Sequence, residues 1–134
     1  MSFIDIYSNN VKRKKEEISR LKKERLKYGG IVSDSGSKIL RAKQQANSTK
    51  SQSTLKSKLN EITREEKKKS DAEKKINEYD KKITAKEKEL NNEEIKLQKE
   101  QEKEMKAQQK RYAESINSLN KNIKLQQIAH LELS

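Results

Sequence analysis

Apolar residues recur one heptad apart between residues 55 and 97, in a stretch without glycine or proline. Because a seven-residue repeat returns to the same side of an α-helix, this row predicts a stripe that a partner helix covers. Lys69 interrupts the row. The second core position of each heptad, four residues after each member of the row, is a companion position, and most companion positions are charged. The stripe therefore needs a partner surface. The row consists of Leu55, Ile62, Ile76, Ile83, Leu90 and Leu97, with Leu59 beside it, and the charged companions are Glu66, Glu73, Asp80, Glu87 and Glu94.

A second heptad pattern begins the chain. Its apolar members alternate at spacings of three and four, and Lys14 and Arg25 interrupt them. Asp5 near the start and basic residues near the end match the helix dipole. The pattern therefore predicts one amphipathic helix over residues 1–28, with the members Ile4, Tyr7, Val11, Ile18, Leu21 and Tyr28.

Residues 29–54 contain two candidate breaks. Gly29-Gly30 and the polar run at 33–37 favour turns, and residues 38–46 are typical of a short second helix. The polar tract at 47–54 ends in hydroxyl residues that can cap a following helix. If this tract reverses the chain, the long helix runs antiparallel to the first segment.

The long helix is expected over residues 55–127, and residues 128–134 are expected to form a tail or a linker to another domain. The heptad register shifts by one residue after Leu97. An apolar stripe then resumes with spacings of four, three and four, at Tyr112, Ile116, Leu119 and Ile123. Together the patterns predict an all-α fold: an elongated coiled coil or antiparallel helical hairpin with one long helix.

These stripes predict that the chain self-associates into a homo-oligomer. The number of helices that join and their relative orientation stay open. The predicted oligomer interface comprises Ile4, Tyr7, Val11, Ile18, Leu21, Leu55, Leu59, Ile62, Ile76, Ile83, Leu90, Leu97, Tyr112, Ile116, Leu119 and Ile123.

Charge adds a second hypothesis. Charged residues make up 40% of the 134-residue chain, and its formal net charge is +12. Such a chain attracts polyanions, so a basic helical protein that binds nucleic acid or an anionic surface is the alternative function. The basic runs at 12–15 and 67–69 lack interleaved aromatic residues, and most lysines of the long helix alternate with glutamates, which is typical of a solvated face.

Catalytic chemistry has little support in the sequence. The chain has no cysteine and only one histidine, His130, so it predicts no catalytic residue, metal site or cofactor. The absence of cysteine is compatible with a cytoplasmic location, and no window is apolar enough to predict a membrane span. We therefore expect this chain not to be an enzyme.

Two segments resemble a known family. The sequence STLKSKLNEITR at 53–64, together with the opening MSFIDIYSNNVKRKKEEI, is similar to the N-terminal coiled-coil region that precedes the TIR (Toll/interleukin receptor) domain in a group of bacterial TIR proteins. In that family the TIR domain hydrolyses or cyclises NAD⁺ once TIR domains assemble. The resemblance implies an oligomerisation or sensing arm of a bacterial defence or virulence protein, and it carries no catalytic residue to this chain.

The expected function is therefore to promote assembly of attached effector domains in a TIR-type NAD⁺-consuming system. A third possibility is a mimic that caps a homologous partner. The trigger, the identity of any following domain and the binding of a polyanion are open at this point.

Overall fold

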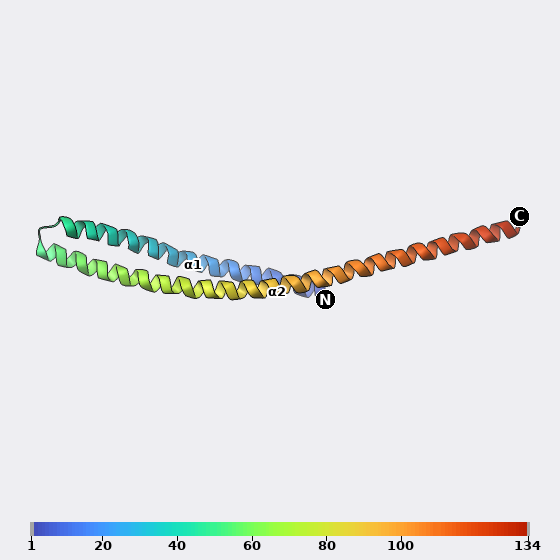
Figure 1. The fold of residues 1–134 in the computed structure, drawn as a ribbon, viewed down its shortest axis with the longest axis horizontal. Coiled ribbons are helices and arrows are strands. Elements are labelled where there is room, and N and C mark those ends of the chain that lie inside the picture. The colour runs from blue at the N-terminus through green and yellow to red at the C-terminus, as the bar shows by residue number, and fades with distance from the viewer. Residues whose placement is uncertain (1, 134) are drawn as a thin grey trace. The chain divides into compact units, whose positions relative to one another are not determined.

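The computed structural model describes residues 2–133 and shows an all-α helical hairpin, which confirms the predicted fold class. Helix α1 spans Phe3–Ser48 and helix α2 spans Gln52–Leu133. The two helices are joined at one end by a short turn (Figure 1). The chain divides into two units, residues 10–91 and residues 1–9 with 92–134. The first unit, which we call the hairpin, contains the turn and all the buried side chains of the described residues.

Local hydrogen bonds explain where the turn lies. Ser51 caps α2, since its hydroxyl accepts a hydrogen bond from the Thr54 amide at 3.3 Å and its carbonyl accepts one from the Leu55 amide at 3.0 Å. Only residues 49–51 lie outside the two helices at this point. The expected polar tract therefore supplies the cap, but through Ser51 and not through its last hydroxyl residues, and α2 begins at Gln52, three residues before the predicted start.

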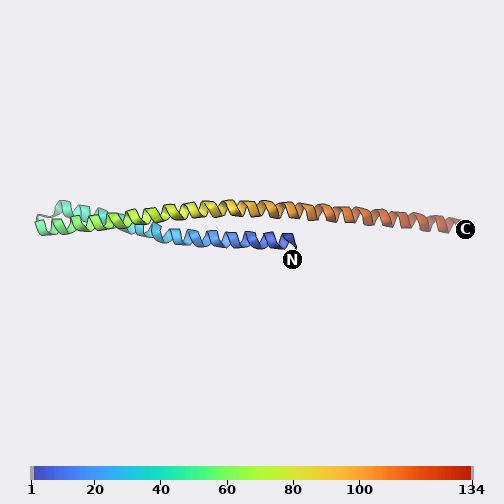
Figure 2. The same ribbon diagram turned by 90° about the horizontal axis from the view of Figure 1, so that it is seen from below.

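The two helices of the hairpin run antiparallel and side by side in both views (Figures 1 and 2). Cross-helix contacts follow the antiparallel order: Lys14 meets Glu89, Arg25 meets Asp80, and Ser35 meets Glu65. The apolar side chains buried between the helices are Val11, Ile18, Ile39 and Ala42 from α1, with Ala72 and Ile83 from α2.

The breaks expected within residues 29–46 are wrong, because α1 is one continuous helix through this segment. Val32, Ser35, Ile39 and Ala42 continue the heptad register of residues 4–28, and all of them are buried or half-buried. None of the described glycines has a positive φ. Packing against α2 therefore outweighs the helix penalty of about 1 kcal/mol per glycine.

The companion positions assigned to α2 are also wrong by one residue. Glu66, Glu73, Glu87 and Glu94 are exposed, and Asp80 is half-buried. The companions that face α1 in the hairpin lie three residues after the apolar row, at Lys58, Glu65, Ala72, Tyr79 and Lys86. Spacings of both three and four keep residues on one helical face, so only the position of α1 decides between them.

Residues 128–133, which were expected to form a tail, are the last residues of α2. Ser134 lies outside the described residues.

Candidate functional site

The predicted interface residues fall into two classes with different surroundings. Inside the hairpin, Val11, Ile18 and Ile83 are buried, whereas Leu21, Ile62, Ile76 and Leu90 are half-buried. Leu55 and Leu59 are exposed at 38% and 51%. In the other unit, Ile4, Tyr7 and Leu97 are half-buried. The remaining four are exposed: Tyr112, Ile116, Leu119 and Ile123.

A polar layer lies in the middle of the hairpin. The Ser35 hydroxyl donates a hydrogen bond to Glu65 Oε2 at 2.9 Å, and both residues are buried. Lys68 Nζ lies 3.5 Å from the other carboxylate oxygen. The Ser35 hydrogen bond, with the positive charges of Lys68 and Lys38, holds the pKa of Glu65 below its ordinary value. This carboxylate is therefore a partnered group rather than a proton donor at neutral pH.

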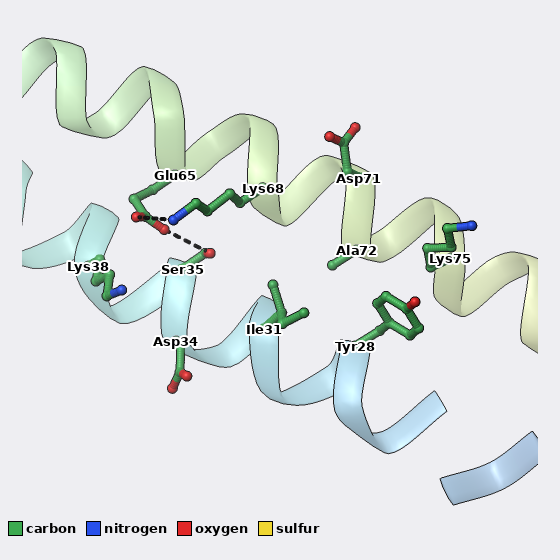
Figure 3. Close-up of a pocket in the computed structure, with 10 residues that line it drawn as sticks. All are labelled: Tyr28, Ile31, Asp34, Ser35, Lys38, Glu65, Lys68, Asp71, Ala72 and Lys75. Carbon is green, nitrogen blue, oxygen red and sulfur yellow. Dashed lines mark hydrogen bonds and ion pairs between the residues drawn. The ribbon is translucent and has the colours of Figure 1, made fainter. Parts of the chain in front are cut away.

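A surface groove of about 500 Å³ lies beside this layer (Figure 3). Tyr28, Ile31 and Ala72 line its apolar side, and Tyr28 stacks on Tyr79 with ring centroids 5.7 Å apart. Asp34 and Asp71 point away from the space between the helices in Figure 3. The groove thus joins an apolar wall to the buried Glu65 carboxylate and the Lys68 ammonium group beside it.

Four charged residues form a closed ring across the two helices. Lys14 Nζ lies 2.9 Å from Glu89 Oε2, and Lys86 Nζ lies 3.2 Å from Glu17 Oε2. The ring closes along each helix, with Lys14 to Glu17 at 3.8 Å and Lys86 to Glu89 at 3.3 Å. These lysines lower the pKa values of Glu17 and Glu89, and the two glutamates raise the pKa of Lys86. The ring pairs specific residues and so favours one alignment of α1 on α2.

The sequence reasoning missed Ser35, Glu65 and the ring as contacts between the helices. The sequence did contain a signal for Ser35, because this residue lies seven residues after Tyr28 and so belongs to the same heptad row. Glu65 and Lys86 belong to the companion row that the four-residue spacing excluded.

The exposed stripe of α2 has different chemistry. We define it as Tyr112, Ile116, Leu119 and Ile123, whose exposed fractions are 69%, 39%, 59% and 43%. Every residue from 108 to 133 is exposed. The positions directly flanking the stripe are all uncharged: Ala113, Ser115, Asn120 and Asn122. Charged residues in this part, such as Glu114 and Lys121, lie farther around the helix.

The described residues contain no group of three acidic, histidine or cysteine side chains that could hold a metal ion. Neither described helix has an apolar stretch long enough to cross a membrane. No protein-family model, curated protein or solved structure matches the chain.

Proposed function

We propose that the chain is an assembly module, in which the exposed stripe of α2 pairs with the same stripe of a second copy. The observation that carries this proposal is an apolar heptad stripe, left exposed, whose flanking positions are all uncharged. Depletion of charge at the centre of a surface is the compositional mark of an interface.

The uncharged side chains that flank the stripe favour a second copy as the partner. The flanking serine and asparagine side chains both donate and accept hydrogen bonds. They can therefore face their own copies in either strand orientation without placing like charges opposite one another. A partner with a strongly charged surface would instead find no counter-charges beside this stripe.

Self-association would act through effective concentration. Pairing two copies makes the encounter of any domains attached to them close to an intramolecular event. The resemblance of residues 53–64 to the TIR-associated coiled coil suggests NAD⁺-consuming domains of the TIR type, in a cytoplasmic bacterial defence protein, as the attached partners. That assignment rests on the resemblance alone, whereas the assembly proposal rests on the exposed stripe.

The decisive experiment compares two charge-matched variants by light scattering and circular dichroism. Ile116→Asp with Leu119→Asp places two charges in the stripe, and Asn117→Asp with Ser118→Asp places the same charges on the other side of the helix. We expect a wild-type mass above that of the 15.7 kDa monomer, monomers only for the stripe variant, and the wild-type mass for the control. A monomeric wild type at high micromolar concentration, or equal masses for the two variants, would exclude the proposal.

A second experiment tests the effector assignment separately. A TIR-type domain fused after residue 134 should consume NAD⁺ faster with the wild-type chain than with the stripe variant. Equal rates, with dimerisation intact in the wild type, would remove the TIR assignment and leave the assembly module.

A further inference from the structure

Positive charge is unequally divided between the two arms of the hairpin. Residues 10–50 carry 13 lysines and arginines against four acidic residues, whereas residues 51–91 carry 12 against nine. Most of the net charge of +12 therefore belongs to the α1 arm.

The excess is concentrated on exposed positions of one segment of α1. We call this segment the basic face; it runs from residue 12 to residue 27, roughly 22 Å of helix. Glu16 is the one acidic residue among the outward positions of this segment. The basic face comprises Lys12, Arg13, Lys15, Arg20, Lys22, Lys23 and Lys27, all of them exposed.

Neighbouring acids do not neutralise this face. Glu17 is held by Lys86 and Lys14, and Glu24 pairs with Lys27 at 3.1 Å. Within the described chain, no carboxylate lies within 4.0 Å of the charged groups of Lys12, Lys15, Arg20, Lys22 and Lys23. Five cations thus remain available to an external anion, spread over the exposed side of a helix that packs against α2.

We propose that the basic face binds the phosphate backbone of duplex nucleic acid, without regard to base sequence. A cluster of unpaired cations on one helix surface suits a polyanion with closely spaced phosphates. Contacts from lysine and arginine to phosphates position a duplex but carry no base information.

Two features of the face favour a duplex over other anions. Single-strand binders use exposed aromatic side chains as stacking platforms, but Tyr28, the aromatic residue nearest this segment in sequence, is stacked against Tyr79 in the hairpin. Helices that bind membranes insert an apolar face, and Leu26 is the one large apolar side chain exposed within residues 12–27.

The test is fluorescence anisotropy with a mixed-sequence DNA duplex of about 20 base pairs at several salt concentrations. The face variant replaces Lys15, Arg20, Lys22 and Lys23 by glutamine. The control replaces Lys106, Lys110, Lys121 and Lys124 by glutamine, so both variants have a net charge of +8 in place of +12. Circular dichroism checks that both keep the wild-type helix content.

We expect the wild type to bind with an affinity that falls steeply with salt. The face variant should bind at least about tenfold more weakly near 50 mM salt, and its slope of log affinity against log salt should shrink by about 0.9 for each phosphate that is no longer neutralised. The control should stay within about twofold of the wild type. A second variant, Lys15→Arg with Lys22→Arg and Lys23→Arg, should retain binding because the charges are kept.

Three results would overturn the proposal. The first is no wild-type binding to the duplex at low salt. The second is an equal loss in the face variant and the control, which would mean that bulk charge, not this face, attracts the duplex. The third is binding to vesicles that contain phosphatidylserine in preference to the duplex. None of these outcomes bears on self-association, because the stripe variant is tested without nucleic acid.

Discussion

The hairpin and the exposed stripe of α2 use opposite kinds of contact surface. The hairpin places charged residues within the contact between its helices, and each of the four ring residues has a partner across that contact. The stripe is apolar, its flanks are uncharged, and all four of its side chains are exposed. Charge is therefore abundant in the contact between the two helices, and absent from the exposed stripe and its direct flanks.

This difference follows from how each partner is supplied. In the hairpin, a turn of three residues keeps α1 beside α2, so even a thin apolar seam meets its partner at high effective concentration. Paired charges then select one alignment against others. A second copy, as proposed for the stripe, would arrive only by diffusion and would have to gain enough from apolar contact to offset its loss of free motion. A more continuous apolar stripe is what such an interface requires.

The largest expected contrast comes from one truncated side chain in each region. Ile83 is 8% exposed, so Ile83→Ala should lower the free energy of unfolding by about 2 kcal/mol or more. Ile116→Ala should change it by less than about 0.5 kcal/mol at dilute concentration, where copies stay apart. Urea unfolding followed by circular dichroism measures both, and similar losses for the two variants would contradict the distinction between the regions.

A smaller effect of opposite sign is expected at the glycines of α1. A Cβ added at Gly29, Gly30 or Gly36 meets no atom within 4 Å. Each glycine-to-alanine change should therefore stabilise the hairpin by about 0.5 to 1 kcal/mol, because alanine restricts the unfolded chain and favours the helix. Amide exchange across residues 29–37 should slow in these variants, while the mass measured by light scattering stays unchanged. Destabilisation would show that these positions contact something in the folded protein.

The same glycines show why the sequence did not predict the full length of α1. Their local preference predicted a break, but the heptad register through Val32, Ser35 and Ile39 continues across them, and a tertiary contact decides the outcome. The heptad spacing predicted each apolar row correctly, whereas the choice between Glu65 and Glu66 as a companion position depended on where α1 lies.

The candidate site was predictable in one part and not in the other. Tyr112, Ile116, Leu119 and Ile123 could be named from spacing alone. Their exposure could not, because periodicity states which residues share a face and leaves open whether the chain itself covers that face. To predict the cross-helix ring, one must know how α1 is aligned along α2. The heptad pattern of a single helix does not contain this information.

Acid should weaken the hairpin through its partnered carboxylates. The folded-state pKa of Glu65 lies below the ordinary value of 4.5, so its contribution to stability is full above that pH and is lost as pH falls through the lowered pKa. Glu17 and Glu89 act in the same direction. Unfolding free energies measured from pH 7 downwards should fall in acid, and Glu65→Gln should make that fall smaller.

The matched control for this titration is Glu114→Gln, which removes one carboxylate near the exposed stripe. It should leave the acid dependence of unfolding as in the wild type. If Glu65→Gln and Glu114→Gln had the same effect, the buried hydrogen bond from Ser35 would not be the cause of the dependence.

The smallest effect is expected at the ion pair between Arg25 and Asp80. Arg25 Nε lies 2.6 Å from Asp80 Oδ1, but the side chains are 42% and 48% exposed, so water screens the attraction. A double-mutant cycle with Arg25→Gln and Asp80→Asn should give a coupling energy below about 1 kcal/mol, and added salt should reduce it. Exchanging the two residues, as Arg25→Asp with Asp80→Arg, should recover most of the coupling. A coupling that survives high salt would mean that this pair is shielded from solvent. The charged residues of the hairpin would then stabilise the contact between its helices as well as fix their alignment. The hairpin and the uncharged stripe would differ in how strongly their contacts hold, and not in how specifically they select a partner.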